Sequence, residues 1–342
     1  MKSFSFDKPR GFALKAASEF YEGFTPGSGM AVADADDLTL AFRLDHSFEA
    51  VAVGLREEGE QIVAQLVGTD DARTARKQVA RMLGLEVEGQ SWLAVGERDP
   101  GVGRLQAEFR GFFTAAKPSP YDAATWGIIA ARLNIKQAAK LKIGLAEQHG
   151  DEVRIKGRLH HVFPSPKQLL EVPTFTGLSD EKLARLKGIA IAALEGKLDP
   201  DRLRAMDEHA ALEELQQLTG VGPWTASHIL YRGAALIDGL PTAEPRVLHG
   251  LADAYRLKEV SAETMSEISE GWRPFRMWVC ILLSRHLGRI GGWQKPEYAK
   301  ERAKAGRALK RHTSHALKLR TVSGAPGNGP FSPAVGLDQW MT

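Results

Sequence analysis

Cysteine is almost absent from the sequence: Cys280 is the only one among 342 residues. An intramolecular disulfide is therefore impossible, and a cysteine-ligated zinc site or iron–sulfur cluster is excluded. No stretch holds the roughly 18 consecutive apolar residues of a membrane span, so a membrane role is not expected. Residues 1–7 lack the apolar segment of a signal peptide, although Lys8, Arg10 and Lys15 leave organelle targeting open. We therefore expect an intracellular protein that is not secreted.

Length and charge set broad limits on the class of protein. The chain is long enough for two or three domains, each with its own core. The formal net charge is +3 and the isoelectric point is near 8.9. This mildly basic balance permits binding to a polyanion without requiring it.

Alternating apolar residues predict an antiparallel sheet early in the chain. Residues 38–44 and 62–67 have the period of two that is typical of strands, with a third apolar stretch at 48–55 and a turn at 57–60. From Asp70 the apolar spacing becomes helical, which predicts a helix packed on this sheet. We place this sheet domain at residues 1–112.

Helical spacing dominates residues 113–293. Asp122 is the predicted N-cap of a helix that runs to Leu133 and beyond. Further helices are expected at 182–194, from Pro200, at 211–218 and after Pro274. The predicted fold class is therefore α+β, with an N-terminal antiparallel sheet domain followed by an all-helical core.

The composition changes again in residues 294–342. Residues 295–320 are rich in lysine and arginine, and residues 324–336 are rich in glycine and proline. This pattern predicts a basic helical arm, which either contacts phosphates or is a solvated helix face, followed by a disordered tail.

Two glycines lie one residue apart between two predicted helices, in the segment Leu218-Thr219-Gly220-Val221-Gly222-Pro223-Trp224-Thr225. Glycines allow a turn with positive φ and leave the backbone uncovered, so amides at the start of the next helix can bind phosphate. Pro223 at the first helical position fixes the entry of the chain into that helix. On its own, Gly-x-Gly is more often a plain connector between helices, so other segments must decide.

This segment resembles the helix-hairpin-helix of the DNA glycosylases that share a Gly/Pro-rich loop and a catalytic aspartate. Within that superfamily it is most similar to the alkylbase group, the DNA-3-methyladenine glycosylase II type. Residues 120–141, 177–186 and 272–276 agree in order and spacing, and the resemblance extends over residues 12–293. It implies a helical glycosylase core with the hairpin near 211–233. It also implies a monomer without a cofactor that binds double-stranded DNA with a damaged base, in the cytoplasm or bacterial nucleoid.

The resemblance implies base-excision repair by a monofunctional enzyme that flips an alkylated purine out of the duplex and releases it by hydrolysis. Positive charge develops on the sugar, and a carboxylate stabilises that charge or orients the attacking water. Glu244 stands where the family has its catalytic aspartate. Its extra methylene moves the carboxylate by roughly 1 Å, a displacement that can cost about a hundredfold in rate. Glu244 can instead be a loop carboxylate or a partner of Arg246, and Asp238 is the alternative catalytic residue.

Four residues are candidates for the base pocket. Trp224 matches a pocket aromatic of the family, and His228 follows one helical turn later on the same face. Where the alkylbase group often has a further pocket tryptophan, this chain has Ser284, with Trp278 one and a half turns earlier. Aromatic walls attract cationic alkylated bases through cation–π interaction. Core packing is the alternative role for Trp224 and His228.

The residues expected to contact DNA are Thr219, Gly220, Val221, Gly222, Pro223, Thr225, Arg132, Leu133 and Arg246. Arg132, or as second choice Leu133, is the predicted wedge that fills the space of the flipped base. Some superfamily members form a Schiff base with a lysine early in the helix after the hairpin, and Trp224 at that position favours a monofunctional enzyme. No metal is needed for the chemistry, although backbone carbonyls of Leu218 and Val221 are candidates to hold a monovalent cation.

Two other functions remain open at this point. Ala131, Ser284 and Glu244 depart from the family pattern, which is consistent with a protein of the same fold that binds damaged DNA without excising a base. A helical interaction module with an incidental hairpin fits the two glycines but not the resemblance along the rest of the chain.

Overall fold

The computed structural model describes residues 2–23, 30–34, 37–242 and 244–292. The basic arm and tail predicted for residues 294–342 therefore lie outside the described residues. None of the helices in these ranges has the length and apolarity needed to cross a membrane.

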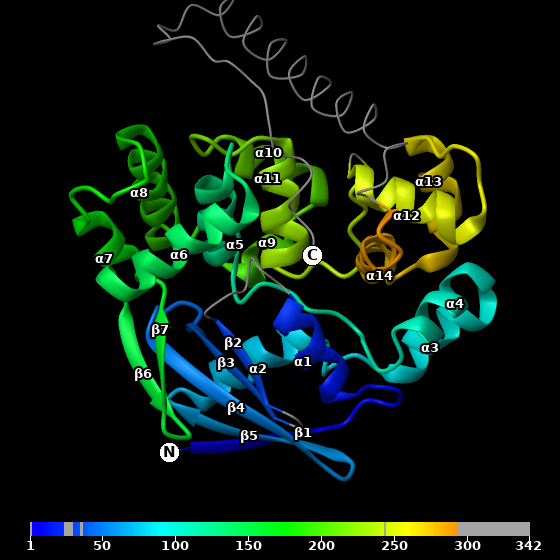
Figure 1. The fold of residues 1–342 in the computed structure, drawn as a ribbon, viewed down its shortest axis with the longest axis horizontal. Helices are drawn as coiled ribbons and strands as arrows, with labels where there is room; N and C mark the ends of the chain where they lie inside the picture. Colours follow the sequence, from blue (N-terminus) through cyan, green and yellow to red (C-terminus); the bar gives the residue numbers. More distant parts are fainter. Residues whose placement is uncertain (1, 24–29, 35–36, 243, 293–342) are drawn as a thin grey trace, which may run out of the picture.

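An antiparallel sheet of five strands forms the base of the molecule in Figure 1, with strand order β1-β5-β4-β3-β2. The strands are β1 (Lys2–Asp7), β2 (Ala31–Asp34), β3 (Asp37–Arg43), β4 (Ala50–Glu58) and β5 (Gln61–Val67). The predicted alternation is clear in β5, where Ile62, Ala64 and Leu66 are buried and the residues between them are not. The antiparallel sheet predicted from sequence is confirmed, while β1 and β2 were not predicted.

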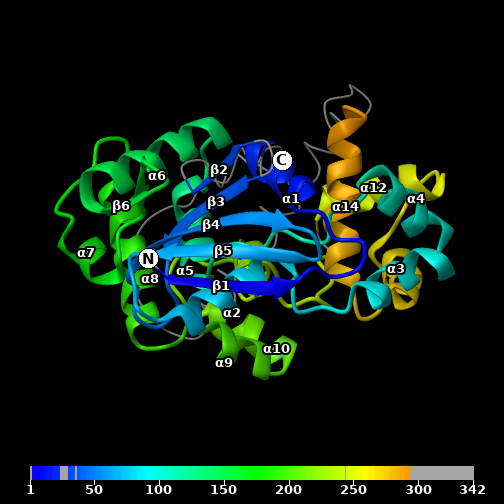
Figure 2. The ribbon, with the colours of Figure 1, turned by 90° about the horizontal axis from the view of Figure 1, so that it is seen from below.

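Helices cover one face of this sheet, as Figure 2 shows from below. Helix α1 (Leu14–Gly23) contacts β2 and β3, and α2 (Ala72–Leu83) contacts β1. The other two helices of the N-terminal region, α3 (Gly89–Arg98) and α4 (Pro100–Glu108), lie away from the sheet against the C-terminal helices. Residues 1–112 thus contribute a sheet with its helices and also part of the support for the last helices of the chain.

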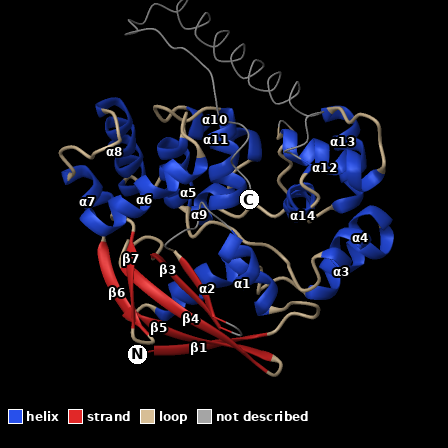
Figure 3. Ribbon diagram, in the orientation of Figure 1, coloured by secondary structure: helices blue, strands red, loops and turns tan. Residues whose placement is uncertain are grey.

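The rest of the described chain is mostly helical, as predicted, and Figure 3 shows these helices stacked above the sheet. The elements are α5 (Pro120–Ala130), α6 (Ile135–His149), α7 (Pro166–Glu171), α8 (Asp180–Leu194), α9 (Pro200–Ala205), α10 (Glu208–Gln216), α11 (Pro223–His228), the π-helical turn η2 (Ile229–Gly233), α12 (Pro245–Tyr255), α13 (Ala262–Ser269), the 3-10 turn η3 (Glu270–Trp272) and α14 (Arg276–Arg289). The α+β fold class is confirmed.

The start of α5 corrects the sequence prediction. Ser119, rather than Asp122, is its N-cap, because the Ser119 hydroxyl accepts a hydrogen bond from the Asp122 amide at 3.1 Å. The helix also ends earlier than predicted, at Ala130, so Leu133 lies in the loop before α6. The Asp122 side chain is consequently available for ion pairs inside the protein.

The prediction of an all-helical core was wrong at one place, where β6 (Asp151–Ile155) and β7 (Arg158–Val162) form a hairpin. Lys156 and Gly157 make its two-residue turn with φ of 48° and 77°, as a tight hairpin requires. Val153, Ile155 and Val162 of the hairpin pack on Ala41 and Ala52 of the sheet. The hairpin therefore covers part of the sheet face that the helices leave open, mainly at β3 and β4.

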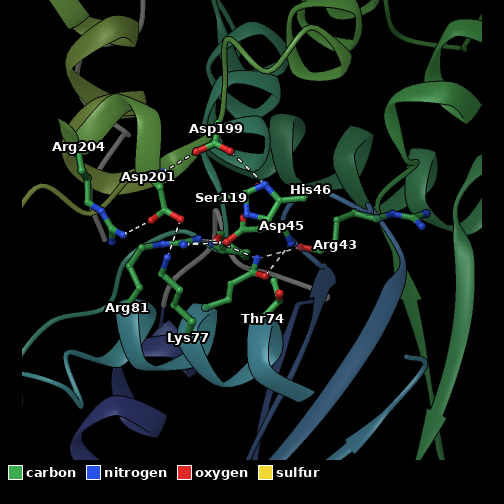
Figure 4. A network of polar contacts seen from close by, with 12 residues as sticks. Arg43, Asp45, His46, Thr74, Lys77, Arg81, Ser119, Asp199, Asp201 and Arg204 are labelled. Carbon is green, nitrogen blue, oxygen red and sulfur yellow. Dashed lines mark hydrogen bonds and ion pairs between the residues drawn. The ribbon is translucent and has the colours of Figure 1, made fainter. Parts of the chain in front are cut away.

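A network of polar contacts joins the sheet domain to the helices (Figure 4). His46 Nδ1 lies 3.0 Å from Asp199 Oδ2, and Lys77 Nζ lies 2.6 Å from Asp201 Oδ2 at the start of α9. Arg81 and Asp45 form a fully buried ion pair at 2.7 Å beside these contacts. Both residues of this pair belong to the sheet domain, and Arg81 reaches the start of the helical region by donating to the Pro118 carbonyl at 2.6 Å.

Helices α12 and α14 approach closely because Gly250 of α12 has no side chain. A Cβ atom at Gly250 would lie 2.4 Å from the Leu283 carbonyl oxygen of α14, a backbone atom that cannot move aside alone. We predict that Gly250→Ala lowers the free energy of unfolding in urea by about 1–3 kcal/mol, because the helices must separate. The matched control is Gly188→Ala in α8, where a Cβ atom meets nothing within 4 Å. This control should gain roughly 0.4–1 kcal/mol, and equal effects of the two substitutions would contradict the packing argument.

Candidate functional site

The two glycines of the hairpin have different roles. Gly220 has φ of 89°, and a Cβ atom there would lie 2.7 Å from the Arg185 side chain, so the fold itself requires glycine. Gly222 is the N-cap of α11 in an extended conformation, and a Cβ atom there would meet nothing within 4 Å. Among the described residues no close contact requires glycine at position 222, and its backbone borders open space. Thr219, Gly220 and Pro223 are exposed around it, whereas Val221 and Thr225 are buried.

Glu244 is the N-cap of α12 and its side chain is 5% exposed. The Trp224 indole Nε1 donates a hydrogen bond of 3.0 Å to Glu244 Oε2, and the Arg246 amide donates one of 3.3 Å to Oε1. Burial raises the pKa of Glu244 above its usual range, while these two donors and the Arg246 charge partly oppose that shift. The carboxylate is thus held in one orientation by the residue that follows the hairpin.

Trp224 and His228 stack on each other, as their positions one helical turn apart predict. Their ring centroids are 5.0 Å apart and the ring planes differ by 12°. Trp224 is partly exposed, whereas His228 is buried beneath it. Burial lowers the pKa of His228 well below its usual range, with further lowering by Lys117 and Arg232, so the imidazole is neutral at pH 7. The structure therefore brings Glu244, Trp224 and His228 together.

The other two predicted pocket residues, Trp278 and Ser284, pack against other parts of the protein. Trp278 packs in an aromatic group with Trp92, Phe113 and Phe275, where its exposed fraction is 3%. Its ring edge also fills the space beside Gly84, at the end of α2. Trp278 therefore contributes to the junction between the N-terminal region and α14, and this cluster could not be seen from the spacing within one helix.

Ser284 and Asp238 also have partners of their own. The buried Ser284 hydroxyl donates to the Cys280 carbonyl at 3.0 Å, one turn earlier in α14. Asp238 forms ion pairs with Arg273 and with Arg276, the latter at 3.0 Å. A carboxylate already held by two arginines is less suited than Glu244 to stabilise a third positive charge.

A basic surface lies beside the hairpin, on the loop after α5 and on α8. Arg132 is exposed in that loop with φ of 61°, and Leu133 next to it is half-buried. Lys182 Nζ donates to the Ile129 carbonyl at 2.7 Å, and the Arg185 side chain reaches Gly220 of the hairpin. Burial, together with the nearby charges of Arg132 and Arg185, lowers the pKa of Lys182 to about 8. Lys182 and Arg185 were not predicted, because only the fold brings α8 to the hairpin.

Two residues that the sequence predicted to bind DNA or a cation have partners inside the protein. Arg246 is 6% exposed, and its backbone amide donates to Glu244. The Leu218 carbonyl, a candidate cation ligand, accepts a hydrogen bond from the Val221 amide at 2.9 Å. Within the described ranges, no group of three or more His, Cys, Asp or Glu side chains is placed to hold a metal ion.

Comparison with known proteins gives consistent matches. The chain is 26% identical over 199 residues to a DNA-3-methyladenine glycosylase of Bacillus subtilis, which covers 56% of this chain and 65% of that protein. It is 25% identical over 212 residues to a probable bifunctional transcriptional activator/DNA repair enzyme AlkA of Mycobacterium tuberculosis, covering 61% of this chain and 42% of that protein. The chain thus spans less than two thirds of the length of either relative. No family model matches the sequence.

Solved structures show the same fold. A 3-methyladenine DNA-glycosylase from Archaeoglobus fulgidus superposes with a TM-score of 0.70 at 22% identity, over 84% of this chain and 98% of that one. The 8-oxoguanine glycosylase/lyase of Clostridium acetobutylicum, solved with double-stranded DNA, superposes with a TM-score of 0.55 at 16% identity, over 77% and 98% of the two chains. These matches show that the chain shares its fold, including the hairpin and the sheet, with solved DNA glycosylases, and that it is similar in sequence to proteins named DNA-3-methyladenine glycosylase.

The buried carboxylate gives a prediction about stability. Because the pKa of Glu244 is raised in the folded protein, the folded state binds a proton more readily than the unfolded state. This difference in pKa contributes to the free energy of unfolding. The contribution is fully present below about pH 4.5, near the unfolded pKa, and is lost as the pH rises through the folded pKa. Glu244→Gln keeps an oxygen acceptor for Trp224 without a charge, so its Tm should exceed the parent's at pH 8. The difference should shrink towards pH 4.5, and a constant difference would contradict burial as the cause.

Proposed function

We propose that the protein is a DNA glycosylase of base-excision repair that releases alkylated purines from duplex DNA by hydrolysis, with Glu244 as the reacting carboxylate. The observation that carries this proposal is the hydrogen bond from Trp224 to the buried Glu244. It supports a site in which a ring that can stack on a base and a carboxylate that can act on its sugar are held together.

The backbone of the DNA would lie across the hairpin. Gly222 leaves the start of α11 uncovered, and the partial positive charge at a helix N-terminus favours phosphate. Arg132, Lys182 and Arg185 add positive charge beside it, which strengthens binding to the backbone without reading sequence. Arg132 is exposed in the loop after α5 and has a left-handed backbone conformation. It is the proposed wedge.

Glu244 is the proposed catalytic residue. As the bond between the base and C1′ of the sugar breaks, its electron pair leaves with the base and positive charge develops on the sugar. The ionised carboxylate stabilises this charge and accepts a hydrogen bond from the attacking water. Trp224 and the Arg246 amide hold the carboxylate in place, so little reorganisation is needed when the substrate binds. The relatives' names support alkylated purines as the substrates to test first.

The experiment is base release from methylated duplex DNA by the parent protein and by Glu244→Gln. We expect the substitution to lower the single-turnover rate by at least about a hundredfold, because the charge that stabilises the sugar cation is lost. Both proteins should bind DNA containing an abasic site equally well. If the parent binds such DNA but frees no base from methylated DNA, the protein is a damage-binding protein instead. Equal rates for the two proteins would remove Glu244 from the mechanism.

The hairpin gives a second test. Gly222→Ala should leave Tm nearly unchanged, because its Cβ atom meets open space and the backbone is extended. The added methyl group should nonetheless weaken duplex DNA binding by roughly tenfold, because it stands between the amides of α11 and a phosphate. The matched control is Gly271→Ala in η3, where a Cβ atom also meets nothing. Equal DNA affinities of the two variants would argue against the hairpin as the contact.

A further inference from the structure

The loop after α5 has a backbone conformation that its sequence does not favour. Ala131 has φ of −52° and ψ of 121°, and Arg132 has φ of 61°. The Leu133 amide donates to the Ala130 carbonyl at 3.0 Å and closes a turn of four residues. These values match a type II turn, whose third residue is normally glycine or asparagine. Arginine is strained at this position, and such strain persists only where the surrounding structure holds the backbone.

Lys182 of α8 holds the end of the helix from which this turn starts. Its Nζ donates a hydrogen bond of 2.7 Å to the carbonyl of Ile129, the residue directly before the turn. The last carbonyls of a helix have no partner within the helix, and the C-terminal end of a helix favours a positive charge. An ammonium group therefore suits this place, where it fixes the end of α5 against α8.

The charge of Lys182 is sensitive to pH just above neutrality. Burial and the nearby charges of Arg132 and Arg185 lower its pKa to about 8. Arg185 in turn pairs with Glu181, one helical turn earlier in α8. Lys182 is therefore largely protonated at pH 7 and largely neutral at pH 9, while both arginines stay charged over this range.

The hairpin packs against the same two helices. A Cβ atom at Gly220 would lie 2.7 Å from Arg185 Cδ and 3.1 Å from Ile128 Cδ1, so both side chains lie close to the hairpin backbone. Ile128 directly precedes Ile129 in α5, and Arg185 follows Lys182 by about one turn in α8. The end of α5 and the hairpin are thus held together by one part of α8.

Building on the proposed function, in which Arg132 is the wedge, we infer that Lys182 is a positioning residue that holds the loop of residues 131–133 in the conformation that inserts Arg132. A loop that already has this conformation loses less freedom when it fills the space of a flipped base. Lys182 therefore contributes to recognition of the vacated position in the duplex. This role is separate from attraction of the DNA backbone, which any nearby cation provides.

The test compares a duplex that contains one abasic site with the same duplex without it. The quantity measured is the ratio of the two dissociation constants, intact over abasic, at pH 7 and fixed salt. A wedge acts only where a base is missing, whereas charge acts on both duplexes. Lys182→Met should therefore lower the ratio by roughly tenfold, as expected when one charge-assisted hydrogen bond is lost. The control is Lys187→Met in the same helix, which removes an equal charge and should leave the ratio unchanged.

The pH dependence of the ratio is a second readout. In the parent protein the ratio should fall as the pH rises from 7 to 9, because Lys182 loses its proton and its hydrogen bond to Ile129 loses the assistance of the charge. The ratio for Lys182→Met should stay constant over this range. The same fall in both proteins would assign the pH dependence to another group and would contradict the inference.

Lys182→Gln is the second variant, used if Lys182→Met does not fold, and it should change the ratio in the same direction. An equal loss of affinity for both duplexes in a folded variant would show that Lys182 supplies only charge, which would overturn the inference and leave the proposed activity untouched. If the parent protein binds the two duplexes equally, the proposed wedge fails and this inference fails with it. Failure of the proposed activity is seen separately, as the absence of base release.

Discussion

The hydrogen bond between the Trp224 indole and the buried Glu244 carboxylate is the interaction on which the candidate site depends. Trp224 is the second residue of α11, directly after the hairpin, and Glu244 is the N-cap of α12. The bond therefore ties the helix proposed to meet the DNA backbone to the helix that carries the proposed reacting group. On that proposal, a shift of the hairpin would move the carboxylate as well and would couple backbone binding to base release.

On the proposed function, the same bond would allow glutamate to serve at a position where the sequence resemblance implies aspartate. The longer side chain reaches both the Trp224 indole and the Arg246 amide, so its extra freedom is restricted. Its place at the start of α12 also favours a negative charge, because a helix N-terminus is partly positive. Burial acts in the opposite direction and raises the pKa of Glu244. The carboxylate is therefore held in one orientation and is poorly hydrated. Both properties suit a group that is proposed to stabilise a developing positive charge.

Sequence reasoning predicted those features that depend on local patterns. Alternation revealed the strands of the sheet, and two glycines before Pro223 revealed the hairpin. Spacing along one helix placed Trp224 and His228 on one face, where they stack. The turn at Lys156 and Gly157 was missed although the residues beside it alternate, because a short hairpin inside a helical region gives a weak signal.

Features that depend on distant contacts could not be predicted. Trp278 lies on a helix that is apolar on nearly all sides, so its spacing does not show which neighbours it packs against. Asp122 of α5 pairs with Lys142 of α6 and with Lys117 in the loop before α5, and in the sequence each of these lysines is indistinguishable from a surface lysine. Glu244 was found by its distance from the hairpin, but its partner Trp224 was assigned only to the pocket. Position along the chain therefore proposed Glu244 as the reacting group without showing how its carboxylate is held.

The most direct measurement of this account is the single-turnover rate of base release by Glu244→Asp. This substitution keeps the charge and introduces the residue type that the sequence resemblance implies, but it shortens the side chain by one methylene. If the Trp224 bond positions the carboxylate, the shorter side chain loses that bond and the rate falls by about a hundredfold. A rate equal to or above that of the parent protein would contradict the account, because the carboxylate would then act without being held by Trp224.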